Sequence, residues 1–293
     1  MDAQEEVEVH VIRRGLDSTT LRKRLGVKPF PSPWMGYLPR RDVDIRTLAN
    51  FMTPEKAEQE RVKRKELLWA GDPNDRALGD LLDLAPEGQP ADLACCPLTT
   101  LNVQTWWGGE ALRVFESFDQ CWMVHPIFHR DSVPFGQLMT IDVGRQKMRM
   151  RRQLERSASP LTVAMGGFEL DADYNREVWV PHFHLAVANC TRAQLEGLRA
   201  HFKPDGDWEA LLQIEEAVNR RRQFAYTAKF VAYRRPFKQH GRKRSGAFRL
   251  RLPEHNEYLR FLARLAPTDL LFAMGVTRSN GQEFKITVPV LDA

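Results

Sequence analysis

The alternation of apolar and polar positions is clearest in the middle of the chain. Two runs, 161–170 and 178–188, are apolar and polar by turns in the way that is typical of strands, and an apolar run at 122–128 precedes them. A further strand-like run covers 283–290 near the end of the sequence. Helical periodicity predicts helices at 141–156, 191–202 and 208–233. The chain is therefore expected to mix helices with strands.

The first third of the chain shows no sustained strand pattern. Residues 1–95 combine clusters of charge with proline and glycine, and we interpret them as an N-terminal arm that is partly helical or disordered. Residues 72–97, at the end of this arm, contain four prolines and are expected to form a loop-rich segment that separates the arm from the main domain. Residues 96–293 are then the main domain, which ends in a basic C-terminal extension.

Two histidines stand on one face of the run at 178–188. Side chains alternate along a strand, so His182 and His184 share a face, and the other face is entirely apolar. The apolar face is sufficient for packing the strand against a core, so packing does not explain the two imidazoles. Two imidazoles at this spacing can bind one metal ion. The alternative is that both histidines are solvated or satisfied within the core.

Glu169 is the predicted third ligand. A tight turn at Asn175 and Arg176 would pair the two central strands so that Glu169 lies opposite His182. A carboxylate with two imidazoles suits Mg²⁺ or Mn²⁺ and leaves positions open for phosphate oxygens. The alternative is a surface glutamate in a hairpin.

A tyrosine and a lysine follow at helical spacing. In the predicted helix, Tyr226 and Lys229 share a face with Arg222 and Tyr233, opposite an apolar stripe. A tyrosine hydroxyl has a pKa of about 10, so it becomes a nucleophile at neutral pH only with a base or a cation nearby. Lys229, one turn further on, is such a cation. The alternative is that these side chains form the solvated surface of a helix.

Composition and charge narrow the possible partners. The chain has 293 residues and a formal net charge of +5, which favours a polyanionic partner. Its apolar runs are too short to cross a bilayer, and its acidic first residues resemble neither a secretory signal nor a transit peptide, so we expect a cytoplasmic protein. The four cysteines form no C-x2-C pair, which argues against a zinc ribbon or a disulfide framework.

Positive charge is most concentrated at 220–251. This stretch contains no acidic residue and interleaves phenylalanines with the basic side chains, an arrangement that suits a phosphate backbone with unpaired bases. The alternative is a solvated basic loop. The candidate nucleic-acid-binding residues are Arg220, Arg221, Arg222, Arg234, Arg235, Lys238, Arg242, Lys243 and Arg244.

Together these segments resemble the HUH endonucleases that initiate rolling-circle replication. Residues 167–170 and 179–187 resemble the family's second motif, in which two histidines flank a bulky apolar residue, and 226–229 resembles its third, Tyr-x-x-Lys. The resemblance covers roughly residues 120–235. The family's first motif, a strand of the type Phe-x-Thr-x-Thr, has no clear copy, since the run at 122–128 lacks the threonines.

The resemblance implies an α+β fold in which an RRM-like antiparallel sheet is flanked by helices. It implies that the metal ligands are His182, His184 and Glu169. It also implies that Tyr226 is the nucleophile, that Lys229 assists it, and that the intermediate is a covalent 5′-phosphotyrosine. Some relatives have a second catalytic tyrosine where Phe230 stands, so a single-tyrosine mechanism is implied, with Tyr233 as a reserve candidate.

The implied function is site-specific nicking and joining of single-stranded or hairpin origin DNA, which starts replication of a plasmid or phage. The sequence has no phosphate-binding P-loop, so a separate helicase and a host polymerase are expected partners. The same chemistry serves HUH transposases and conjugative relaxases. An alternative of another class is a non-catalytic nucleic-acid-binding regulator on an RRM-like fold.

Overall fold

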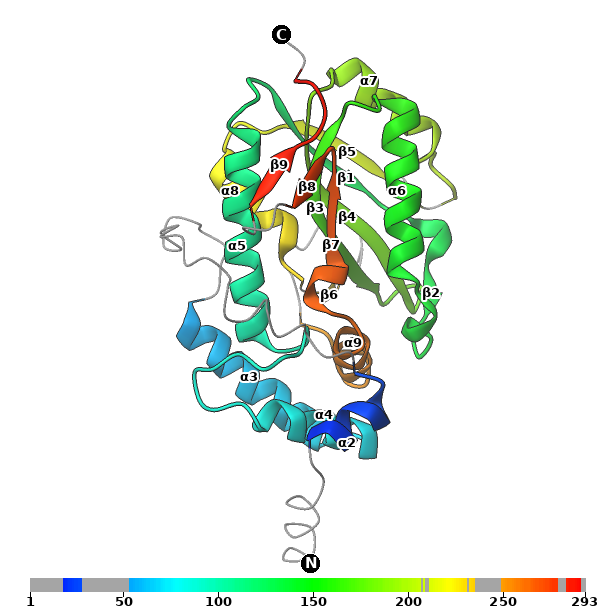
Figure 1. Ribbon diagram of the computed structural model, residues 1–293. Coiled ribbons are helices and arrows are strands. Elements are labelled where there is room, and N and C mark those ends of the chain that lie inside the picture. The colour runs from blue at the N-terminus through cyan, green and yellow to red at the C-terminus, as the bar shows by residue number, and fades with distance from the viewer. Residues whose placement is uncertain are drawn as a thin grey trace, which may run out of the picture.

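In the computed structural model, helices flank a mainly antiparallel sheet, which confirms the predicted α+β class. The structure describes residues 18–27, 53–206, 208, 211–230, 232–234, 249–278 and 283–290. Figure 1 shows the sheet with α5 and α8 to one side and α6 to the other. The helices are α2 (Ser18–Leu25), α3 (Pro54–Trp69), α4 (Pro73–Asp83), α5 (Pro97–Phe115), α6 (Val143–Ser157), α7 (Arg192–Glu196), α8 (Arg220–Ala225) and α9 (Glu254–Ala263).

The main sheet has the central strand order β5-β1-β4-β3-β6 in the described part of the chain, with β2 paired to β4 and β7 paired to β3. All pairings in it are antiparallel except the short contact of β3 with β6. Strands β8 and β9 form a separate hairpin. The strands are β1 (Cys121–Pro126), β2 (Val133–Pro134), β3 (Val163–Asp173), β4 (Val178–Ala188), β5 (Leu212–Glu216), β6 (Tyr233–Arg234), β7 (Leu271–Met274), β8 (Val276–Arg278) and β9 (Phe284–Ile286).

The hairpin of β3 and β4 carries the predicted site, and its predicted register is confirmed. Glu169 pairs with His182 along an uninterrupted antiparallel ladder. The connection spans four residues, 174–177, and is centred on the predicted turn. The Asp173 carboxylate accepts hydrogen bonds from the backbone N–H groups of Asn175 and Arg176, which fixes the turn.

The apolar face of this hairpin packs under α6. Phe183 is fully buried and contacts the ring of Phe128, over which the Arg149 guanidinium of α6 lies at 5.0 Å. Helix α6 confirms the helix predicted at 141–156, and Asp142 caps its first turn. The predicted helix at 191–202 is also found, as α7 followed by a 3-10 turn at 197–200. Helix α6 therefore covers the face of the hairpin that carries Phe183, and His182 and His184 lie on the opposite face.

The opposite face of the hairpin is approached by the 3-10 helix η6 (Tyr226–Ala228). Gly167 lies on this face because it is two residues before Glu169. A Cβ atom at Gly167 would come within 2.7 Å of the Thr227 carbonyl oxygen and 3.4 Å of the Ala228 Cα. The missing side chain therefore lets η6 sit directly against β3.

The single helix predicted at 208–233 is wrong. Residues Leu212–Glu216 form β5, in which Leu212 and Ile214 are buried while Gln213 and Glu215 are exposed. This alternation has a period of two, which overrides the helix-forming character of the glutamates that follow. The Asn219 side chain then caps α8, which gives way at Tyr226 to η6, so the predicted stripe does not continue along one helix to Tyr233.

The loop predicted at 72–97 is also wrong over its first half. Residues Pro73–Asp83 form α4, which begins with a capping box between Asp72 and Asp75. Pro73 occupies the first turn, where a missing N–H costs nothing, and so does not oppose a helix. Pro97 begins α5 in the same way, a helix that the sequence pattern did not indicate.

The N-terminal helices gather with α9 at one end of the sheet (Figure 1). Arg260 of α9 binds the carboxylates of Asp72 and Asp75, and Asn256 donates to Asp75 and to the Leu67 carbonyl. These bonds attach α3 and α4 to the C-terminal part of the chain. In the described part, no helix has the length and apolar character needed to span a membrane, and all four cysteines are free thiols.

Candidate metal centre and tyrosine site

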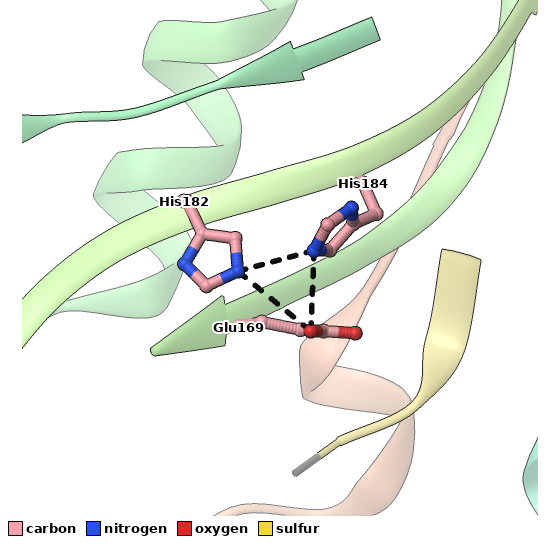
Figure 2. Close-up of side chains that lie close together, drawn as sticks. All are labelled: Glu169, His182 and His184. Atoms are coloured by element: carbon pink, nitrogen blue, oxygen red, sulfur yellow. Dashed lines mark hydrogen bonds and ion pairs between the residues drawn. The ribbon is translucent and has the colours of Figure 1, made fainter. Parts of the chain in front are cut away.

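Glu169, His182 and His184 form a compact cluster on the site face of the β3–β4 hairpin. Figure 2 shows both imidazoles, from β4, and the carboxylate, from β3, pointing toward one another. The His182 Nε2 atom lies 3.2 Å from His184 Nε2, and the Glu169 Oε2 atom lies 3.7 Å and 3.4 Å from these two nitrogens. Within the described residues, these are the ones grouped closely enough to hold a metal ion.

The spacing of these three atoms fits a divalent cation. Metal–nitrogen and metal–oxygen bonds of about 2.1 Å place neighbouring ligand atoms about 3.0 Å apart at a right angle and about 3.4 Å apart at a tetrahedral angle. The separations in the cluster are 3.2, 3.4 and 3.7 Å. Small side-chain movements would therefore bring all three atoms onto one ion.

Glu169 is the most deeply buried member of the cluster, with its side chain 1% exposed. Burial by itself raises the pKa of a carboxyl group, but the electrostatic contact with His184, the ammonium charge of Lys229 and the hydrogen bonds with His182 and His184 hold the pKa of Glu169 well below its usual value. Burial also lowers the pKa of His184. The cluster thus offers a carboxylate and a neutral imidazole, the forms that bind metal ions.

Tyr226 and Lys229 lie against the same cluster. The Tyr226 ring packs edge-on to the His184 ring at 4.9 Å between centroids. The Lys229 Nζ atom lies 3.3 Å from the centre of the Tyr226 ring and 3.8 Å from Glu169 Oε2, and the Lys229 backbone N–H donates to Glu169 Oε1 at 3.1 Å. Gln104 of α5 donates to the Lys229 carbonyl and helps to hold this turn in place.

All five predicted site residues line one cavity of about 500 Å³. The cavity is also lined by Asp171, which follows Glu169 on the same face of β3, and by Gln213 of β5. A volume of this size admits a group as large as a nucleotide. The structure therefore brings the predicted ligands, the tyrosine and the lysine to one concave surface.

His125 is a site residue that the sequence interpretation missed. It stands on β1, inside the apolar run at 122–128, and its Nδ1 atom contacts the Nδ1 atom of His184. The pKa of His125 is lowered to about 3, mainly by burial and to a smaller extent by the nearby His184 and His182, so its imidazole is neutral. Its position before a proline within an apolar run was the available signal, since an imidazole there has no packing role.

Of the predicted DNA-binding residues, four lie in the described part of the chain and five lie outside it. Arg220 donates to the carbonyls of Phe115 and Asp119, which ties α8 to the end of α5. Arg221 and Arg222 are exposed at the start of α8, and the Arg234 guanidinium lies 5.6 Å from the Tyr174 ring. The residues outside the described part of the chain are Arg235, Lys238, Arg242, Lys243 and Arg244. DNA binding by this set stays a prediction.

Comparison with protein-family models, with curated proteins and with solved structures finds no match for this chain. Its function is therefore argued from the chemistry of the cavity.

Proposed function

We propose that this protein nicks and rejoins single-stranded DNA by a metal-assisted attack of Tyr226, as rolling-circle replication initiators do. The observation that supports this proposal is the placement of Tyr226 and Lys229 against the Glu169, His182 and His184 cluster in one cavity. A structural metal site would have no need of a tyrosine and a lysine beside its open side. Phosphodiester transesterification makes use of every one of these groups.

His182, His184 and Glu169 would hold Mg²⁺ or Mn²⁺, which when bound would withdraw charge from a non-bridging oxygen of the scissile phosphate. The phenol oxygen of Tyr226 forms a bond to phosphorus as its proton passes to solvent. The bond from phosphorus to the 3′ oxygen breaks, and that oxygen leaves with the electron pair and takes up a proton. The products are a 5′-phosphotyrosine and a free 3′-hydroxyl, and joining is the reverse reaction.

Lys229 has two roles in this scheme. Its ammonium group lies over the Tyr226 ring, where its charge favours the developing phenolate. It also lies 3.8 Å from Glu169, so it helps to keep that carboxyl group ionised and able to bind a cation. Its removal should therefore affect the rate of attack more than the fold.

The partners follow from the products. A 3′-hydroxyl primes synthesis, so the proposal includes single-stranded or hairpin origin DNA as substrate, a separate helicase, a host polymerase and action in the cytoplasm. Initiation of plasmid or phage replication is the favoured role. Transposition and conjugative transfer use the same chemistry, and the non-catalytic regulator is the alternative that the following experiment separates.

The test is covalent capture. A pool of single-stranded oligonucleotides of random sequence, labelled at the 3′ end, is incubated with the protein and Mn²⁺, and the mixture is denatured before electrophoresis. We expect the label to stay on the wild-type chain, and to be absent with EDTA or from Tyr226→Phe and His182→Ala. Tyr174→Phe, which changes a tyrosine outside the cavity, is the matched control and should retain the label.

A non-catalytic binding protein would give no labelled band under any of these conditions, which would contradict the proposal. Label transfer by Tyr226→Phe at the wild-type rate would exclude Tyr226 as the nucleophile. Transfer in EDTA at the wild-type rate would exclude the metal ion.

A further inference from the structure

His125 is brought to the cluster by the pairing of β1 with β4. The register sets Val124 opposite Leu185, so the next residue of β1, His125, lies opposite His184. The two rings lie 4.5 Å apart between centroids and 71° from parallel, and their Nδ1 atoms are in hydrogen-bond contact. This contact joins residues 59 positions apart in the sequence.

The two ring nitrogens of His184 face different neighbours. Its Nε2 atom lies 3.2 Å from His182 Nε2 and 3.4 Å from Glu169 Oε2, on the side where an ion would bind. Its Nδ1 atom faces His125. Since a neutral imidazole carries one proton, a His184 that binds a metal through Nε2 must carry its proton on Nδ1.

We propose that His125 is a positioning residue, which accepts a hydrogen bond from the Nδ1–H group of His184 and so fixes the tautomer that presents Nε2 to the ion. This inference rests on the proposed metal site. His125 then carries its own proton on Nε2. A metal-bound histidine usually donates its second N–H to a carboxylate, a carbonyl or water, and here an imidazole takes that place.

His182, the other proposed histidine ligand, has a backbone carbonyl as the partner of its Nδ1 atom. The His182 Nδ1 atom lies 3.4 Å from the Val180 carbonyl oxygen, which can accept its proton and leave Nε2 for the ion. Both imidazoles therefore present Nε2 to the cluster, and each is held in orientation by a hydrogen bond at Nδ1, to Val180 for His182 and to His125 for His184. His125 contacts the Nδ1 side of His184, away from the cluster atoms, so it supports a ligand and is not one.

The inference is tested by the affinity for Mn²⁺, measured by titration calorimetry on the full chain. His125→Leu keeps an apolar side chain of similar size in the strand but removes the acceptor. We expect it to bind Mn²⁺ about 10- to 100-fold more weakly than the wild type. His125→Asn puts an amide oxygen where Nδ1 was, and should bind within a few-fold of the wild type. His201→Leu, which replaces an exposed histidine, is the matched control for loss of a histidine.

A second measurement uses the wild-type chain alone. In the imidazole ¹⁵N–¹H correlation spectrum of the Zn²⁺-loaded protein, His184 should show a protonated Nδ1, and His125 a protonated Nε2. This spectrum tests the assignment even if a variant at position 125 does not fold.

Three results would overturn the inference. These are binding of Mn²⁺ by His125→Leu as tight as by the wild type, a loss of affinity in His125→Asn equal to that in His125→Leu, and a proton of His184 on Nε2. In each case the wild type still binds the ion, so the proposed metal site stands. Absence of Mn²⁺ binding by the wild type, by contrast, would overturn the metal site together with the role of His125.

Discussion

Replacement of Gly167 by alanine should separate metal binding from catalysis. Ordinary contacts of a Cβ atom begin at 3.4 Å, whereas a Cβ atom here would lie 2.7 Å from the Thr227 carbonyl oxygen. The added methyl group is thus about 0.7 Å too close to a backbone atom, which a side-chain rotation cannot relieve. The 3-10 helix η6 must move away from β3, and it carries Tyr226 and leads to Lys229.

The size of the effect follows from this displacement. Overpacking of this kind costs about 1–3 kcal/mol of unfolding free energy. A misplacement of about 1 Å at a reacting group lowers a rate by about 100-fold, so we expect covalent capture to be about 10- to 100-fold slower in Gly167→Ala. The proposed metal ligands lie on β3 and β4, so Mn²⁺ affinity should change by only a few-fold.

Three measurements check this prediction: the rate of covalent capture, the Mn²⁺ affinity and the urea midpoint. Gly144→Ala is the matched control, since Gly144 is exposed on α6 and its Cβ atom would approach only the side chain of Asp142. Wild-type capture by Gly167→Ala would refute the reasoning that close approach of η6 to β3 positions Tyr226.

Three further predictions follow. Lys229→Met keeps the length of the side chain but removes the charge 3.3 Å from the Tyr226 ring centre, so capture should slow by about 100- to 1,000-fold; a rate within twofold of wild type in single-turnover assays would contradict its role. Arg61 is buried and donates to the carbonyls of Leu82 and Ala85, which joins α3 to the end of α4. Arg61→Met should therefore lower the unfolding free energy measured in urea by about 1–3 kcal/mol, whereas Lys63→Met, which changes an exposed side chain of the same helix, should leave it unchanged. Burial raises the pKa of Cys95 to about 12, of Cys121 to about 11 and of Cys190 to about 12, so iodoacetamide at pH 8 should label these thiols only after denaturation. Rapid labelling of the native chain in an intact-mass spectrum would show that the thiols are more accessible than the structure indicates.

The cluster of Glu169, His182 and His184 was predictable because it depends on local sequence. A strand period of two puts His182 and His184 on one face, and the position of one turn then decides what lies opposite them. The turn at Asn175 and Arg176 is short, so the choice of register was small. Glu169 was therefore found from the sequence alone.

His125 was not predictable in this way. Its contact with His184 depends on the pairing of β1 with β4, which is not set by a short turn, because β2, α6 and β3 lie between the two strands in the sequence. The helix predicted at 208–233 failed for a related reason. The alternation at Leu212–Glu216 is brief, and its strand is formed by pairing with the distant β1.

The most direct test of the central claim is to map the residue that bonds to DNA. After capture on a short oligonucleotide with Mn²⁺ and nuclease trimming, trypsin should release residues 223–229, which contain Tyr226, separately from residues 230–234, which contain Tyr233. The account predicts a nucleotide adduct on the first peptide, at Tyr226, that is lost when EDTA replaces Mn²⁺. An adduct on the second peptide, or none on either, would contradict it.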